Sequence, residues 1–95
     1  MSTESRLVPK EDLANVQFTR EDVLEDLAKI RLRNIYLQKA EKLGNAYKGK
    51  VRVRIKTRDG NILGVETTIW AANDEYITIK GGINIPTKAI IEIEF

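Results

Sequence analysis

The stretch from Lys48 to Arg58 alternates between basic and other side chains. Its basic residues occupy every even position: Lys48, Lys50, Arg52, Arg54, Lys56 and Arg58. The apolar residues Val51, Val53 and Ile55 lie between them. Successive side chains of a β-strand point to opposite faces, so this pattern predicts a strand with an apolar inner face and a basic outer face.

Further strand segments rich in β-branched residues follow this one. The five predicted strand segments are residues 51–57, 62–71, 76–80, 83–85 and 90–95. Short turns join them and leave no room for helices between them. This arrangement predicts an antiparallel meander that closes into a small β-barrel over residues 47–95. Pro86 cannot donate a backbone hydrogen bond, so the strand at 83–85 should be short.

The first hairpin can be placed in register from its apolar residues. A two-residue turn, Asp59-Gly60, would set the apolar face of one strand against the polar face of the other. A three-residue turn, Arg58–Gly60, aligns the two apolar faces and puts Gly60 in the left-handed conformation that such turns require. The expected pairs are Ile55–Leu63, Val53–Val65, Arg54–Gly64, Arg52–Glu66 and Lys48–Trp70.

The pattern of residues 20–43 predicts one helix that precedes the barrel in the chain. Thr19 is a favourable N-cap with Asp22 three residues later, and Gly44 is a plausible stop. The apolar residues form two stripes: Val23, Leu24, Leu27 and Ile30, and on the opposite face Leu32, Ile35, Tyr36, Ala40 and Leu43. Two stripes suggest two contacts. The second stripe should contact the N-terminal arm or a second chain, or stay exposed.

The length of 95 residues predicts one domain rather than two. We expect an N-terminal arm at residues 1–18, partly mobile, and a single α+β domain at residues 19–95. Leu13, Val16 and Phe18 are the arm residues expected to dock onto the body of the domain.

The chain contains no histidine and no cysteine. The commonest general base and the thiolate nucleophiles and metal ligands are therefore missing. Glu92 and Glu94 are expected two residues apart on one exposed strand face, where nothing desolvates either as an acid/base pair would require, and Asp74-Glu75 falls short of a calcium ligand set. We expect a protein that is not an enzyme, with no catalytic residue, metal, cofactor or small-molecule substrate.

The sequence gives no sign of a membrane partner. No run of residues approaches the eighteen or so apolar residues that a membrane-spanning helix needs. Residues 1–13 lack the apolar core of a secretion signal. We expect a cytoplasmic protein.

Residues 47–95 resemble a small barrel of the Sm-like kind. The resemblance rests on the Asp59-Gly60 turn, Gly64 in the second strand, a long third-strand hairpin, and IPTKAIIEIEF as a turn and closing strand. It implies RNA binding and ring-shaped oligomers that form by strand pairing between subunits. The base-contacting motifs of that family have only distant counterparts in Asn73-Asp74 and Lys80-Gly81, so the fold is carried over to this chain but no base-contacting residue is. The segment VETTIWA…YITIKGG…IP also resembles small bacterial proteins, which implies no function.

One functional hypothesis is binding of RNA or single-stranded DNA. Lysine and arginine side chains on one strand face can follow a phosphate backbone, and outward-facing aromatic residues can stack on bases. The residues predicted to bind are Lys48, Lys50, Arg54, Lys56, Arg58, Trp70 and Tyr76. Two alternatives for the basic row stay open. It can be a solvated face on which Glu92 and Glu94 of the last strand neutralise Arg52 and Arg54, or it can bind an acidic protein.

The alternative function is self-association with no nucleic-acid role. A homo-oligomer would form through helix 20–43 or through a barrel edge. Trp70 is compatible with both hypotheses, because it can stack on a base or on Lys48, pack under the helix, or lie in a subunit interface.

Overall fold

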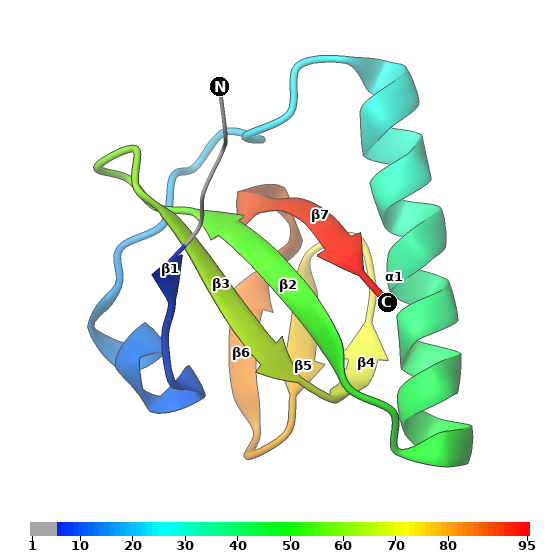
Figure 1. Ribbon diagram of the computed structural model, residues 1–95. Coiled ribbons are helices and arrows are strands. Elements are labelled where there is room, and N and C mark those ends of the chain that lie inside the picture. The colour runs from blue at the N-terminus through cyan, green and yellow to red at the C-terminus, as the bar shows by residue number, and fades with distance from the viewer. Residues whose placement is uncertain (1–5) are drawn as a thin grey trace.

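The computed structural model describes residues 6–95 (Figure 1). Its elements are β1 (Arg6–Leu7), the 3-10 helix η1 (Lys10–Asn15), α1 (Leu27–Tyr47), β2 (Val51–Lys56), β3 (Ile62–Thr67), β4 (Ile69–Ala72), β5 (Tyr76–Ile79), β6 (Ile83–Pro86), the 3-10 helix η2 (Thr87–Ala89) and β7 (Ile90–Glu94). The predicted α+β class is confirmed. The strands form a four-stranded sheet in the order β1-β3-β2-β7 and a three-stranded sheet in the order β4-β5-β6.

The β2–β3 hairpin has the register expected from its apolar residues. Ile55 lies opposite Leu63, and Arg52 lies opposite Glu66. Gly60 adopts the expected left-handed conformation, with a φ of 87°. The expected pair of Lys48 with Trp70 is wrong. The ladder ends at Val51 and Thr67, and Lys48 instead caps the end of α1 with a φ of 54°.

The long second strand of the prediction, residues 62–71, is divided at Thr68. Its first part, β3, belongs to the four-stranded sheet, and its second part, β4, belongs to the three-stranded sheet. The chain therefore crosses from one sheet to the other at this residue. Both sheets contribute to one buried core, which includes Val53, Ile55 and Val65 from the first and Ile69, Ile77, Ile79 and Ile85 from the second.

Helix α1 lies along the sheet edges that a closed barrel would join. No closed barrel is detected among residues 6–95, because β4 and β7 end their sheets without pairing with each other. The helix contacts both strands (Figure 1). Arg33 donates to the Ile90 carbonyl of β7 at 3.1 Å, and Gln38 donates to the Ala72 carbonyl of β4 at 3.3 Å. The Ala72 N–H donates to Glu41 at 3.1 Å. These side chains of α1 therefore hydrogen-bond to strand backbone groups that a neighbouring strand would otherwise bind.

Helix α1 begins at Leu27 and not at the predicted residue 20. The N-cap is Asp26, whose carboxylate accepts a hydrogen bond from the Ala28 N–H at 2.8 Å. The preceding segment is held out of the helix by Asp22. Its carboxylate accepts from the Leu24 N–H at 2.9 Å and from both terminal nitrogens of Arg33 at 2.7 and 2.8 Å. A side-chain partner distant in sequence thus overrides the local helix signal.

The Asp22–Arg33 ion pair is the buried electrostatic contact of the fold. The Arg33 side chain is 3% exposed and that of Asp22 is 20% exposed. Burial opposes ionisation of Asp22, but the hydrogen bonds from Arg33 and from the Leu24 N–H, together with the charges of Arg33 and Lys88, outweigh it. The pKa of Asp22 is therefore lowered below its ordinary value.

Gly44 was predicted to stop the helix, and this prediction is wrong. The helix continues through Gly44 to Tyr47. A Cβ at Gly44 would collide with the Ile69 carbonyl oxygen and would touch the Thr68 side chain. Glycine here lets α1 approach the backbone of β4 closely, which is a tertiary requirement and not a capping role.

The buried face of α1 differs from the two predicted stripes. Its buried residues are Arg33, Leu37, Ala40 and Gly44. Leu37 belongs to neither stripe. In the second stripe Ala40 is buried, whereas Leu32 and Ile35 stay exposed. The helix therefore packs on the sheets through one face and leaves aliphatic residues on another.

Residues 6–18 of the N-terminal arm lie on the side of the sheets away from α1 (Figure 1). Leu13 is buried in the core, and Val16 and Phe18 pack against it, as expected. β1 adds a short parallel strand to β3, which the sequence did not predict. The expected mobility of the first residues concerns positions 1–5, which lie outside the described residues. Within residues 6–95 no helix has the length and apolar character needed to cross a membrane.

Candidate nucleic-acid interface

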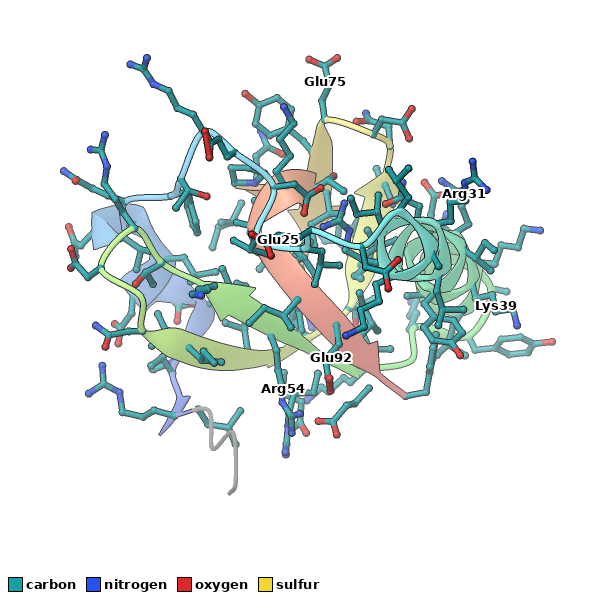
Figure 2. The ribbon with its side chains drawn as sticks, turned by 90° about the horizontal axis from the view of Figure 1, so that it is seen from above. Glu25, Arg31, Lys39, Arg54, Glu75 and Glu92 are labelled. Atoms are coloured by element: carbon teal, nitrogen blue, oxygen red, sulfur yellow. The ribbon has the colours of Figure 1, made fainter. Side chains whose placement is uncertain are left out.

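Acidic residues on the neighbouring strands neutralise the middle of the basic row. β7 lies antiparallel beside β2, with Arg54 opposite Glu92 and Arg52 opposite Glu94. The Arg54 guanidinium lies 2.8 Å from Glu92 and 3.0 Å from Glu94. Arg52 lies 3.8 Å from Glu66 and 4.0 Å from Glu94. Figure 2 shows Arg54 and Glu92 projecting together from the same sheet face. The solvated, ion-paired arrangement therefore describes this part of the row.

Lys56 and Arg58 lie at one end of β2 and line a groove of about 600 Å³. The opposite wall of this groove is the acidic segment 21–26. Arg58 is also tied to the arm, because its guanidinium donates to the Gln17 side chain at 3.3 Å and its N–H donates to the Gln17 carbonyl at 2.9 Å. Acidic residues across the groove disfavour a phosphate at these two predicted positions.

Lys50 lies near the other end of β2 and joins two lysines that the sequence analysis did not select. A hollow of about 290 Å³ is lined by Lys50, by Lys10 of η1 and by Lys80, which follows β5. We call Lys10, Lys50 and Lys80 the lysine corner. The three residues come from separate segments, so no local pattern in the sequence could have indicated that they meet.

Two acidic residues modify the charge of the lysine corner. Glu66 lines the same hollow. Glu11 lies 3.1 Å from the Lys10 ammonium. A hydrogen bond from its own backbone N–H and the adjacent Lys10 lower the pKa of Glu11. Glu11 therefore stays ionised and competes for Lys10.

Trp70 and Tyr76 lie on the outer face of the three-stranded sheet. Their neighbours Ile69 and Ile77 are fully buried, whereas Trp70 is 47% exposed and Tyr76 is 52% exposed. The β4–β5 ladder shifts register between Ile69 and Ala71, so Trp70 is the extra residue of a bulge. Trp70 is therefore only partly covered by the rest of the described structure. Among the described residues the one cation–π contact is Lys39 over Tyr36, so Trp70 does not stack on Lys48.

β5 leads from the aromatic residues to the lysine corner. Tyr76, Thr78 and Lys80 alternate with the buried Ile77 and Ile79. At about 3.3 Å per residue, Tyr76 and Lys80 lie roughly 13 Å apart along the chain. Thr78 donates a hydrogen bond to Asn84 of β6 at 2.7 Å. We call Trp70, Tyr76, Thr78 and Asn84 the aromatic face.

The structure therefore separates the seven predicted binding residues into five places. Arg54 lies in the ion-paired centre, and Lys56 and Arg58 face the acidic segment. Lys50 belongs to the lysine corner, and Trp70 and Tyr76 belong to the aromatic face. Lys48 stays exposed at the end of α1, where its N–H donates to the Gly44 carbonyl at 3.0 Å. Family models, curated proteins and solved structures were compared with the chain, and none matches it.

Proposed function

We propose that this protein is a non-enzymatic module that binds single-stranded nucleic acid, either RNA or DNA. The observation that carries the proposal is the pair of half-exposed aromatic residues, Trp70 and Tyr76, on the outer face of one small sheet. Aromatic side chains on a sheet face form stacking platforms for unpaired bases, and each stacked base contributes about 1–3 kcal/mol. Large aromatic residues are seldom left exposed without a partner.

The lysine corner supplies the second part of the interface. Lys80 directly follows β5, the strand that carries Tyr76, and Lys50 and Lys10 line the same hollow. Bases stacked on Trp70 and Tyr76 would continue into a backbone whose phosphates contact these lysines. Thr78 and Asn84 offer hydrogen-bonding groups between the two parts. In this proposal Arg54 has a structural role, because two carboxylates already hold it.

The resemblance to Sm-like barrels belongs to the same proposal. Two small sheets around one core, with a helix ahead of them, support it. The proposed module differs from a subunit of an Sm ring at the edge strands of its sheets. Side chains of α1 bind backbone groups of β4 and β7, which leaves fewer groups for strand pairing between subunits. We therefore propose binding by this module without ring formation.

Titration of fluorescein-labelled twelve-nucleotide oligo-U and oligo-dT at 50 and 200 mM salt tests the proposal. We expect binding that weakens as salt rises, and quenching of Trp70 fluorescence, which is specific because the chain has one tryptophan. Replacing Lys10, Lys50 and Lys80 by glutamine should reduce the slope of log K against log salt by about 2, at roughly 0.7 per phosphate contact.

A matched control removes the same charge elsewhere. Replacing Lys39, Lys42 and Lys88 by glutamine should change the salt slope by much less, because these exposed lysines lie outside the lysine corner. Absence of binding at 50 mM salt would overturn the proposed function. Equal effects of the two triple variants would also overturn it, because affinity would then follow net charge alone.

A further inference from the structure

Helix α1 carries an exposed face that the proposed function does not use. Three aliphatic residues on this face, Leu27, Leu32 and Ile35, are 69%, 47% and 52% exposed. Basic residues are interspersed with them at 31, 39 and 42, at spacings that share this side of a helix. Figure 2 shows Arg31 and Lys39 pointing away from the sheets. We call Leu27, Arg31, Leu32, Ile35, Lys39 and Lys42 the basic helix face.

The charges of the basic helix face are not neutralised within the described part of the chain. No carboxylate of residues 6–95 lies within 4 Å of the charged nitrogens of Arg31, Lys39 or Lys42. The single acidic residue of α1 is Glu41, which accepts a hydrogen bond from the Ala72 N–H. In the acidic segment ahead of the helix, Glu25 lies on the side toward the sheets (Figure 2), and the Asp26 carboxylate accepts from the Ala28 N–H.

An apolar hollow adjoins the basic helix face. It has a volume of about 380 Å³ and lies between α1 and β7. Its apolar lining consists of Leu24, Leu32, Tyr36, Ile91 and Ile93. Lys29 and Arg33 also line it, as does Glu92, which is paired with Arg54. Beside the hollow, Phe95 packs edge-on against Tyr36 with ring centroids 5.9 Å apart and is itself 63% exposed. Leu32 belongs to both the face and the hollow and connects them.

We propose that the basic helix face and this hollow form a docking surface for an acidic segment of another protein. The segment would place an apolar side chain in the hollow and its carboxylates against Arg31, Lys39 and Lys42. Charge complementarity carries the inference, since three cations without a carboxylate partner among residues 6–95 surround aliphatic residues on one helix. The surface shares no residue with the aromatic face or the lysine corner, so this proposal stands independently of nucleic-acid binding.

Other occupants fit the surface less well. In a symmetric dimer through this face, the same three cations of each copy would approach one another. A nucleic-acid backbone offers no apolar group to Leu27, Leu32 and Ile35. A flat bilayer would contact the aliphatic residues but would leave the hollow empty. An acidic peptide with an apolar anchor satisfies the charges, the aliphatic residues and the hollow together.

Selection of a displayed library of random twelve-residue peptides against the full chain tests this docking surface. We expect enriched peptides to combine several acidic residues with a large apolar residue. A fluorescein-labelled copy of the most enriched peptide should bind at least tenfold more weakly to the R31E/K39E/K42E variant. It should bind the K10E/K50E/K80E variant within about twofold of wild type, because that variant makes the same charge change at the lysine corner.

The remaining outcomes overturn the docking proposal. In the first, the enriched peptides do not combine acidic residues with a large apolar residue. In the second, R31E/K39E/K42E and K10E/K50E/K80E weaken peptide binding equally. Dimerisation of the wild-type chain in light scattering that is lost in R31E/K39E/K42E would assign the face to a second copy instead. Binding to vesicles containing phosphatidylserine that is lost in the same variant would assign it to a membrane surface. Circular dichroism of each variant establishes that it is folded.

Discussion

The outer faces of the two sheets differ in whether their side chains already have partners within the fold. On the four-stranded sheet, Arg52 and Arg54 meet glutamates from both neighbouring strands. On the three-stranded sheet, Trp70 and Tyr76 remain half exposed. The first face has the more conspicuous sequence pattern, yet its charges are largely used within the fold. Alternating charge along one strand thus does not by itself indicate charges that are free to bind a partner.

The largest effect on binding should come from the aromatic face. Replacing Trp70 and Tyr76 together by alanine should weaken oligo-U binding about a hundredfold, since each lost stacking contact costs about tenfold. Fluorescence anisotropy at 50 mM salt measures this. Tyr47→Ala is the control, because Tyr47 is 80% exposed at the end of α1 and outside the aromatic face. Unchanged oligo-U affinity in the double variant would mean that the aromatic face does not bind nucleic acid. The two sheet faces would then not differ in binding.

A second prediction contrasts the buried ion pair with the exposed ones. Asp22→Asn should lower the free energy of unfolding by about 2 kcal/mol, because it leaves the buried Arg33 without a charged partner. Glu92→Gln is the matched control. It removes one carboxylate from an exposed network and should cost below about 1 kcal/mol. Urea denaturation at pH 7 measures both, and equal losses would mean that burial does not distinguish the pairs.

The same pair has a predictable dependence on pH. The pKa of Asp22 is lowered from its ordinary value of 3.8, so the unfolded chain takes up its proton at a higher pH than the folded chain. The pair therefore stabilises the fold fully above about pH 4, and this contribution is lost as the pH falls through the lowered pKa. The stability difference between wild type and Asp22→Asn should be constant from pH 7 to pH 5 and should shrink below pH 4. A difference that grows on acidification would contradict this assignment.

A third prediction concerns the arginines of the four-stranded sheet. Replacing Arg52 and Arg54 by glutamine should lower the free energy of unfolding by about 1 kcal/mol, since exposed ion pairs contribute little individually. Oligo-U affinity at 150 mM salt, where distant charges are screened, should change by less than about twofold. Replacing Glu92 and Glu94 by glutamine releases the arginines and tests the same point in reverse. A large gain of affinity in that variant would mean that the arginine face binds nucleic acid.

The sequence predicts those features of this molecule that depend on neighbouring residues in a strand. The pairs Ile55–Leu63 and Arg52–Glu66 follow from side-chain alternation and the demands of a glycine turn. Neutralisation of Arg52 and Arg54 by Glu92 and Glu94 was one of the alternatives, based on the assumption that the last strand lies beside the first, and the structure adds the register. Features that depend on distant segments were not predicted. Gly44 lies within the helix because β4 passes close to it, and Asp22 leaves the helix because Arg33 binds it.

The candidate site likewise contains features that depend on neighbouring residues and features that depend on distant segments. Alternation along β5 gave the outward parity of Tyr76, a local property. The lysine corner combines Lys10 of η1, Lys50 just before β2 and Lys80 just after β5, so it exists only after the two sheets and the arm have packed together. Contact of α1 with the edge of β4 was likewise unpredictable, because it depends on one hydrogen bond that Gln38 donates to Ala72 and one that Glu41 accepts from it.

The smallest predicted effect tests whether Lys10 belongs to the interface. Glu11→Gln should strengthen oligo-U binding about twofold at 50 mM salt, because the Lys10 ammonium, 3.1 Å from Glu11, would then be available to a phosphate. Asp12→Asn removes the same charge from the next residue of η1. No lysine or arginine nitrogen among residues 6–95 lies within 4 Å of its carboxylate. If both variants strengthen binding equally, the gain comes from net charge, and Lys10 has no particular place in the lysine corner. If Glu11→Gln alone does so, the corner includes the arm, and the interface begins on the segment that precedes the helix.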